Sequence, residues 1–427
     1  MKLTYDQSLV SDAQLTALVN QLADYRERLE HIAAQTTYQE PESSLALPSD
    51  ERLLADVRDL AARLRSPTLQ YVIVIGIGGS NLGAQAVYEA VAGSMNLLVD
   101  RLPKLLFLDT VTDEKMTAVM RVLEHLSSRE DFLVIAVTKS GTTTETVANT
   151  EVIWKFVEEQ FGNARDRFVF ITDEDSKLWR LAKEKKAQRL PVPALVGGRF
   201  SVFCAVGLLP LALAGIDVEE LLTGARRAVT DGLSPDLKKN HSIVSACLTH
   251  THAQLGRNIR NTFLFSPRFE GLGKWERQLV AESLGKDGKG ITPIVSIGST
   301  ALHSMAQLYW GGPDDKFTHL VSSFTGEVHA VAQHPALSGL VANIHGTSLE
   351  SIMQAIYGGV KTAYTQKTLP FAEIDLGKAD ARELGYYLQF RMLEVMYLGR
   401  LMEVNAFDQP AVEMYKEVTR TLLRTRG

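Results

Sequence analysis

The feature that most limits the fold of this chain is a set of short, nearly continuous apolar runs. The first four runs are rich in Val, Ile and Phe and occupy residues 71–75, 105–108, 132–137 and 167–171. Such runs are typical of strands that are buried on both faces of a sheet. The segments between them, such as 84–91 and 145–159, are long enough for helices, so the pattern predicts repeated βαβ units in a doubly wound α/β domain.

A second group of strand-like runs predicts a second α/β domain. These runs occupy residues 262–265, 292–297, 319–323 and 370–374. Before the first group, apolar residues recur at helical spacing after the expected caps Ser11 and Asp50, so an amphipathic helix is expected to open the chain. The predicted organisation is a helical segment at 1–66, α/β domains at 67–200 and 201–385, and a helical tail at 386–427.

Charge and cysteine content narrow the classes of function. The chain of 427 residues carries 50 acidic and 45 basic residues, and this balance disfavours binding to nucleic acid or to a membrane surface. Cys204 and Cys247 are the only cysteines, too few for a disulfide framework or a four-cysteine metal site. The amino terminus lacks the apolar core of a signal peptide, and no apolar run is long enough to span a bilayer. A cytoplasmic protein is expected.

A glycine-rich sequence, GIGGSNLG at residues 76–83, follows the first predicted strand. In an open parallel sheet this turn lies at the carboxyl ends of the strands, where glycines let backbone N–H groups approach an anion. A dinucleotide fingerprint requires glycine where Asn81 stands, and a Walker loop requires lysine where Ala84 stands. Two interpretations remain: a phosphate or sugar-phosphate loop with Ser80 as a hydroxyl donor, or a tight strand-to-helix turn without a ligand.

A hydroxyl-rich sequence, TKSGTTTET at residues 138–146, follows the third predicted strand. Six of its nine residues carry hydroxyl groups, and Gly141 relaxes the turn. Many neutral donors beside the positive end of a helix suit a phosphate monoester. The alternative is a helix cap with spare threonines, but a cap needs only one hydroxyl group.

Two further sequences supply charged groups. GGRFS at residues 197–201 places Arg199 in a glycine-flanked loop, either as a buried cation that faces developing negative charge or as a surface residue. In the stretch 276–290, Gln278 and Glu282 are four residues apart and so share a helix face. A carboxylate beside the apolar residues 280, 281 and 284 could have the raised pKa that suits proton abstraction, although a lone Glu on a helix is usually only solvated.

The histidines do not predict a metal site. His250 and His252 are two residues apart, point to different helix faces and lack an accompanying Cys or carboxylate signature. His303 lies shortly after the predicted strand 292–297. That position suits an active-site residue and a capping residue equally.

Six sequences in this order closely resemble the glucose-6-phosphate isomerase family in its shorter bacterial form. They are IGIGGSNLGA, TKSGTTTET, VGGRFSVFCAVGLLPLALAGID, QLVAESLGKDGKG, TALHSMAQ and NAFDQPAVEMYK, and the match runs from about Tyr71 to Lys416. The resemblance implies two flavodoxin-like sugar-isomerase (SIS) domains with parallel sheets in three αβα layers, no metal or other cofactor, and a homodimer with active sites completed across the interface. The implied reaction is the reversible isomerisation of glucose 6-phosphate and fructose 6-phosphate through ring opening and a cis-enediolate, as in glycolysis and gluconeogenesis.

The resemblance also implies a role for each matching residue. It implies that the phosphate is held by Ser80, Thr138, Ser140 and Thr143. Lys139 and Thr146 of the same loop, and Gly79, are further substrate-binding residues. It implies that Glu282 is the base that moves a proton between C1 and C2 and that Arg199 steadies the enediolate. It assigns ring opening to His303, from the partner subunit, and to Lys416, and it assigns contacts with the sugar to Gln278 and Gln409.

Local departures from the family pattern affect positioning rather than reaction class. Ala306 stands where the family commonly has Gly, Pro410 and Tyr415 replace residues often seen as Trp or Gly, and the threonine-aspartate pair usual before the Leu-His of TALH is missing. An isomerase that also acts on mannose 6-phosphate, or one that acts on an amino sugar, is the nearest alternative enzyme. A non-catalytic sugar-phosphate sensor is the alternative of another class, and the lack of a basic helix-turn-helix pattern favours the enzyme.

Overall fold

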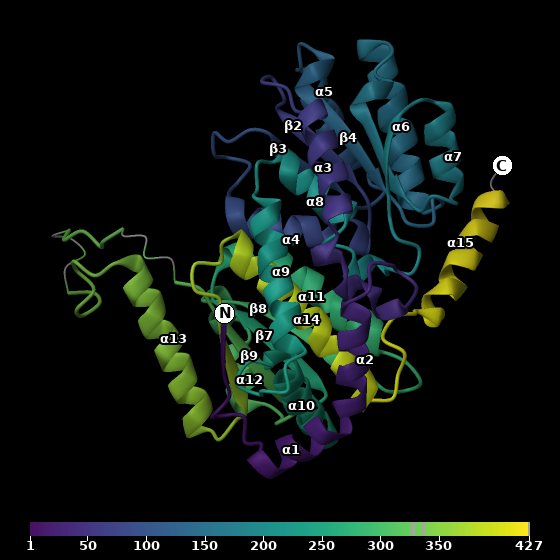
Figure 1. The fold of residues 1–427 in the computed structure, drawn as a ribbon. Coiled ribbons are helices and arrows are strands. Elements are labelled where there is room, and N and C mark those ends of the chain that lie inside the picture. Colours follow the sequence, from purple (N-terminus) through teal and green to yellow (C-terminus); the bar gives the residue numbers. More distant parts are fainter. Residues whose placement is uncertain (325, 327–328, 335–336, 338, 426–427) are drawn as a thin grey trace.

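The computed structural model describes the chain except residues 325, 327–328, 335–336, 338 and 426–427, and it contains two five-stranded sheets (Figure 1). The strands of the first sheet are β2 (Tyr71–Ile75), β3 (Lys104–Leu108), β4 (Phe132–Val137), β5 (Phe168–Thr172) and β6 (Gln188–Pro191). Their order across the sheet is β3-β2-β4-β5-β6, and every pairing is parallel. This order is flavodoxin-like, because the first of these strands in the sequence lies between the second and the third.

The second sheet repeats this order. Its parallel strands are β7 (Ile259–Leu264), β8 (Thr292–Ile297), β9 (Lys316–Ser322) and β10 (Phe371–Asp375), arranged as β8-β7-β9-β10. A fifth strand, β1 (Lys2–Thr4), pairs antiparallel with β10 at the edge. The repeated order confirms the predicted α/β class with two parallel sheets.

The position of β1 overturns one expectation from the sequence. A helix was expected to open the chain, but β1 precedes the first helix and pairs Leu3 with Ile374. A strand of three residues is too short to show a period of two in the sequence. The helices α1 (Asp12–Gln21), α2 (Ala23–Ala33) and α3 (Glu51–Leu64) follow, and Ser11 and Asp50 cap α1 and α3 as predicted.

Helices cover both faces of each sheet. The outer face of the first sheet packs against α5 (Asp113–Glu124), α6 (Thr144–Phe161) and α7 (Lys177–Glu184), and that of the second packs against α12 (Ala306–Gly311) and α13 (Leu349–Gln366) (Figure 1). The inner faces share one continuous apolar core with α3, α4 (Leu82–Ala92), α8 (Ala205–Leu213), α9 (Val218–Gly232), α10 (His241–Gln254), α11 (Glu270–Leu284) and α14 (Ala381–Leu401). The two sheets are therefore joined through a common interior. No helix of the described residues has the length and apolar composition that a membrane span needs.

The carboxyl-terminal part is not the single helical tail that was expected. The helix α14 is buried along almost its whole length and belongs to the core. The chain leaves this helix at Met402, and Glu403 adopts a positive φ of +54°. Helical structure resumes with a 3-10 turn at Pro410–Val412. The last helix, α15 (Glu413–Arg424), stands away from the body of the molecule (yellow in Figure 1) and has no buried residue.

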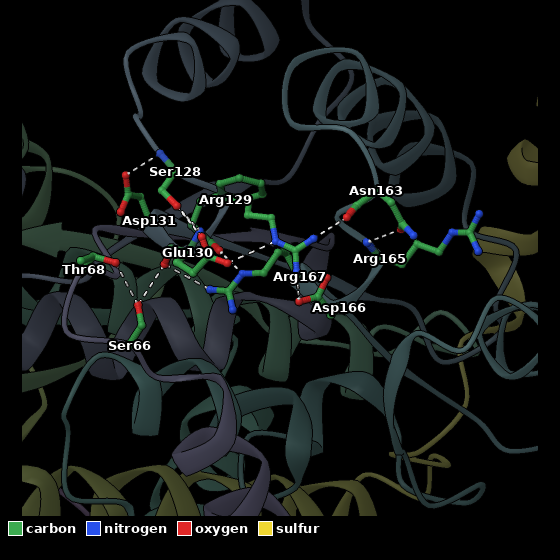
Figure 2. A network of polar contacts seen from close by, with 11 residues as sticks. Ser66, Thr68, Ser128, Arg129, Glu130, Asp131, Asn163, Arg165, Asp166 and Arg167 are labelled. Atoms are coloured by element: carbon green, nitrogen blue, oxygen red, sulfur yellow. Dashed lines mark hydrogen bonds and ion pairs between the residues drawn. The ribbon is translucent and has the colours of Figure 1, made fainter.

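A polar network closes the amino-terminal edge of the first sheet (Figure 2). Arg167, buried just before β5, donates to the first carbonyl of β4 at 3.0 Å and to the Glu130 carbonyl at 3.3 Å. Ser66 Oγ donates to the same Glu130 carbonyl at 3.0 Å, and Arg129 pairs with Asp166 at 2.7 Å. These contacts tie together the segments that lead into β2, β4 and β5.

Candidate active site

Two of the predicted loops meet at the carboxyl ends of β2 and β4. The glycine loop (residues 76–81) leads from β2 to α4, and the hydroxyl loop (residues 138–143) leads from β4 to α6. A Cβ atom at Gly76 would lie 2.9 Å from Ser80 Cβ and 3.2 Å from the Val137 carbonyl oxygen. The glycine loop therefore touches the end of β4, from which the hydroxyl loop starts, as expected for neighbouring parallel strands.

The hydroxyl loop gathers its side chains at the amino end of α6. Thr138 Oγ1 and Thr143 Oγ1 share a hydrogen bond of 2.7 Å, and Thr142 Oγ1 donates to Ser140 Oγ at 3.2 Å. Gly141 has a φ of +67°, a backbone conformation that is strained for other residues. Thr143 is the N-cap residue of α6 but makes no capping bond, so its hydroxyl does not satisfy the N–H groups of the first turn.

Three other residues expected at the phosphate differ in their surroundings. Ser80 is half-buried, and its hydroxyl has no hydrogen-bond partner among the described residues. The Thr146 hydroxyl is buried in the first turn of α6, also without a partner in the described part of the chain. Burial lowers the pKa of Lys139, and the nearby Asp173 and Cys204 partly offset this effect. A helix amino end, an ammonium group and unpaired hydroxyls together suit an anion.

The loop that carries Arg199 packs backbone to backbone against the glycine loop. A Cβ atom at Gly79 would lie only 2.1 Å from the carbonyl carbon of Gly198, so no other residue fits there without a shift. Ser201 Oγ donates to the Gly198 carbonyl at 2.7 Å and lies 3.4 Å from the Gly79 carbonyl oxygen. This contact places Arg199 directly beside the glycine loop.

Arg199 is a buried cation, which decides between the two alternatives that its sequence left open. Its side chain is 2% exposed, and burial lowers its pKa against the opposing effect of the Glu282 and Asp408 carboxylates. It donates to Ser283 Oγ (2.7 Å), Gln409 Oε1 (2.9 Å) and the carbonyl oxygens of Ala406 (2.6 Å) and Asp408 (3.0 Å). Its Nη1 also lies 3.6 Å from Glu282 Oε1. The guanidinium plane is thus fixed from several sides.

Glu282 lies in the last turn of α11 with 26% of its side chain exposed. Gln278 Nε2 donates to Glu282 Oε2 at 2.9 Å, and Gln278 Oε1 is buried without a partner in the described part of the chain. A Cβ atom at Gly78 would lie 2.8 Å from Gln278 Nε2, so this helix face meets the glycine loop. The apolar surroundings expected for Glu282 are incomplete, because Ala281 is exposed.

A buried ion cluster anchors the helix that carries Glu282. Glu276, one and a half turns earlier on α11, pairs with Arg260 of β7 and with Arg391 of α14 (3.4 Å). Glu394 lies 3.0 Å from Arg260 and 2.9 Å from Arg391. Although burial alone raises the pKa of Glu276, Arg391 and Arg260 together lower it to about 2. The cluster therefore remains charged and ties α11 to the second sheet.

Two predicted residues are not brought to this site within the single chain. His303, at the end of a 3-10 turn (Thr300–His303), is exposed and has no hydrogen-bond partner among the described residues. Lys416 lies on α15 and pairs with Glu413 at 2.6 Å. No contact joins either residue to Arg199 or Glu282 in the described part of the chain.

Sequence reasoning missed three residues that contribute to the site. Ser283 accepts from Arg199, and Lys286 Nζ donates to the carbonyls of Glu282 (3.1 Å) and Ser283 (2.7 Å). Lys286 also lies 3.5 Å from an oxygen of Asp408, whose carbonyl accepts from Arg199. The Asp-Gly pair that follows Lys286 was a usable turn signal. The link to Asp408 spans 122 positions in the sequence and leaves no local pattern.

The sequence matches the profile of a known family over most of its length. The family profile described as phosphoglucose isomerase matches residues 27–333, which is more than half of the 427 residues. The chain belongs to the phosphoglucose isomerase family. The match includes the glycine loop, the hydroxyl loop, Arg199 and Glu282.

Individual relatives extend the match over nearly the whole chain. A protein of Rubrobacter xylanophilus named glucose-6-phosphate isomerase is 37% identical over 402 residues, which cover 91% of this chain and 90% of the relative. A protein of Haloarcula marismortui named probable glucose-6-phosphate isomerase is 34% identical over 417 residues, which cover 97% of this chain and 91% of the relative.

Solved structures show the same fold as this phosphoglucose isomerase family member. A hypothetical protein from Thermus thermophilus has a TM-score of 0.89 at 30% identity, covering 99% of both chains. A glucose-6-phosphate isomerase from Chlamydia trachomatis has a TM-score of 0.83 at 20% identity, covering 99% of this chain and 88% of the other. A tagatose-6-phosphate ketose/aldose isomerase from Escherichia coli, with a TM-score of 0.53 at 14% identity, covering 87% of this chain and 94% of the other, shares the fold alone.

Proposed function

We propose that this phosphoglucose isomerase family member interconverts glucose 6-phosphate and fructose 6-phosphate through ring opening and a cis-enediolate. The observation that carries the proposal is the meeting of Glu282 and Arg199, 3.6 Å apart, beside the glycine loop. The names of the two relatives, glucose-6-phosphate isomerase and probable glucose-6-phosphate isomerase, supply the substrate. No step of the proposed chemistry uses a metal or another cofactor.

The phosphate binds between the two loops at the carboxyl ends of β2 and β4. Ser80 and the hydroxyls of Thr138, Ser140 and Thr143 donate to it, with Lys139 and the amino end of α6 adding positive potential. The backbone N–H of Gly79 is a further donor to the substrate. The phosphate is remote from the reacting carbons. Because it is bound, it holds those carbons in place and removes translational freedom before the reaction.

Proton transfer between the two carbons is the central step. The Glu282 carboxylate takes the proton from C2 of the open aldose, the electron pair moves onto the carbonyl oxygen, and the enediolate forms. The hydroxyl proton on O2 moves to O1, and the protonated Glu282, which exchanges its proton with solvent in part of the turnovers, returns a proton to C1 to give the ketose. Arg199 stabilises the negative charge that develops on the oxygen, in a position fixed before the reaction. Gln278 and Gln409 orient the hydroxyl groups of the sugar.

Ring opening needs an acid and a base before this step. We assign these roles to Lys416 and to His303 of a second copy of the chain in a homodimer. The exposed position of His303 supports this assignment. The helix α15 also exposes the apolar residues Met414, Val418 and Leu422 along one face, which a second chain can cover.

A coupled assay tests the function directly. The purified chain should convert fructose 6-phosphate to glucose 6-phosphate in excess chelator, because the proposed acid, base and cation are all side chains. Binding of fructose 6-phosphate without turnover would indicate a sensor. Turnover that chelator abolishes and zinc or manganese restores would contradict the mechanism.

A mixing experiment tests the shared active site. Glu282→Gln and His303→Ala homodimers should each be inactive, but a mixed dimer would contain one intact site. Random exchange of equal amounts makes about half of the dimers mixed, so roughly a quarter of native activity should return after joint unfolding and refolding. Tagged heterodimers without recovered activity would place His303 within its own chain or outside the chemistry.

A further inference from the structure

A tight turn follows the helix that carries Glu282. The backbone N–H groups of Lys286 and Lys289 each donate to the other's carbonyl, at 3.1 and 2.8 Å. Between them, Asp287 and Gly288 have φ values of +53° and +72°, the pattern of a type I′ turn that Asp-Gly favours. The turn therefore fixes the backbone from which two lysine side chains extend.

The first lysine of the turn joins the end of α11 to Asp408. Only 7% of the Lys286 side chain is exposed. Its Nζ donates to the carbonyls of Glu282 and Ser283, which lie at the helix end where carbonyls lack helical partners. The same Nζ lies 3.5 Å from Asp408 Oδ1. Burial lowers the pKa of Lys286, Arg199 lowers it further, and Asp408 counters both effects.

The second lysine holds the other end of the same segment. Lys289 Nζ donates to the Met402 carbonyl at 2.9 Å and lies 3.6 Å from Glu403 Oε2. The segment 402–409, which links α14 to the turn before α15, is therefore attached to the lysine turn near both of its ends.

The segment 402–409 in turn holds Arg199. Its Ala406 and Asp408 carbonyls accept both Nη2 bonds, and its Gln409 side chain accepts from Nη1. Among the hydrogen bonds of Arg199 to the described residues, only the one from Nε to Ser283 goes to another part of the chain, and the Glu282 carboxylate lies 3.6 Å from Nη1. A shift of this segment would therefore rotate the guanidinium relative to Glu282.

We propose that the Lys286–Lys289 turn is a positioning clamp that fixes segment 402–409 and, through it, the orientation of Arg199 relative to Glu282. Lys286 is the main positioning residue, because it bonds at once to the backbone of Glu282 and to Asp408. Neither lysine takes part in proton transfer. The inference rests on the proposed function, since it names the residues that align the groups of that reaction.

Lys316 offers a matched control for the loss of Lys286. It is equally buried, with 8% of its side chain exposed, and its Nζ also bonds a backbone carbonyl (Pro313, 3.0 Å) and an aspartate (Asp315). It lies at the start of β9, and no contact in the described part of the chain links it to Arg199. Both Lys286→Met and Lys316→Met thus remove a buried ammonium with similar partners.

The first test compares kcat and KM for fructose 6-phosphate in these two variants. Lys286→Met should lower kcat roughly 10- to 100-fold, the scale of a misplaced catalytic group. Its KM and its affinity for a phosphorylated inhibitor should stay within about twofold, because the phosphate loops are untouched. Lys316→Met should lose stability but keep its kcat. A folded Lys286→Met enzyme with native kcat would overturn the proposal.

A double variant tests whether Lys286 acts through Asp408. Asp408→Asn keeps the carbonyl that accepts from Arg199 but removes the charge that meets Lys286. If the two residues form one link, Lys286→Met with Asp408→Asn should lower kcat no further than the worse single variant. Independent, multiplying losses would contradict the link.

A measurement that does not depend on turnover separates the clamp from the proposed function. Hydrogen exchange of the amides of 402–409 should be about tenfold faster in Lys286→Met, the loss expected for a charge-assisted bond, and unchanged in Lys316→Met. Unchanged exchange in Lys286→Met would overturn the clamp whether or not the enzyme is active. Native protein that fails to isomerise fructose 6-phosphate would instead contradict the proposed function.

Discussion

The two edges of the first sheet differ in whether their polar side chains have hydrogen-bond partners within the chain. At the amino-terminal edge, Arg167 donates to two backbone carbonyls, and Ser66 donates to one of the same carbonyls (Figure 2). At the carboxyl-terminal edge, the hydroxyls of Ser80 and Thr146 have no partner among the described residues. The first edge is complete in itself, whereas the second provides groups that a ligand can satisfy.

This difference indicates that one edge of the sheet serves stability and the other serves substrate binding. A satisfied network of buried bonds stabilises the fold. Polar groups left without partners cost free energy and are expected where a substrate supplies the missing bonds. Two buried arginines, Arg167 and Arg199, represent the two edges and allow a direct comparison.

The largest effect should come from replacing each arginine by methionine. Arg199→Met should lower kcat roughly 10²- to 10³-fold, because the charge that faces the enediolate is lost. Arg167→Met should leave kcat unchanged but lower the free energy of unfolding by about 1–3 kcal/mol, because buried carbonyls lose their donor. Steady-state kinetics and urea unfolding of both variants measure the difference.

The comparison between the edges would fail if both arginine variants lost kcat to a similar degree. It would also fail if Arg199→Met kept native turnover while unfolding more easily. Both variants remove a buried cation, so a loss of stability in Arg199→Met alone does not distinguish them.

An intermediate effect is expected at the phosphate loops. Ser80→Ala and Thr143→Ala should each weaken the binding of a phosphorylated inhibitor by about 1–3 kcal/mol, the scale of a hydrogen bond to a charged group. An unphosphorylated sugar analogue should bind almost equally to the native chain and to both variants. Calorimetric titration of the two ligands provides the test, and equal losses for both ligands would show that the loops are only structural.

The smallest effect is expected for Ser66→Ala at the amino-terminal edge. This change removes one neutral donor from a carbonyl that Arg167 still satisfies. The free energy of unfolding should fall by about 0.5–1 kcal/mol, and kcat should not change. A measurable fall in kcat would mean that the two edges are coupled.

The sequence predicted those parts of the fold and site that leave a local pattern. Buried parallel strands appear as apolar runs, and the glycine and hydroxyl loops appear as unusual composition directly after such runs. The structure places the glycine loop beside the loop of Arg199, and Arg199 Nη1 lies 3.6 Å from Glu282 Oε1, while the roles that the resemblance implied for these residues stay predictions.

What the sequence did not show depends on contacts between distant residues. The strand β1 was missed because its three residues acquire meaning only beside β10. Lys286 and Asp408 were missed because their link forms only when segment 402–409 folds back onto α11. The roles of His303 and Lys416 depend on contacts that the single chain does not contain, so these roles stay predictions.

The central claim is that Glu282 moves the proton at this edge, and isotope exchange tests it most directly. Glu282→Gln keeps the shape of the side chain but removes the base. In deuterated water the native protein should exchange the C2 proton of glucose 6-phosphate, while Glu282→Gln should bind the same ligand with nearly native affinity and show no exchange. Full exchange in Glu282→Gln would contradict the account and assign the base to another residue.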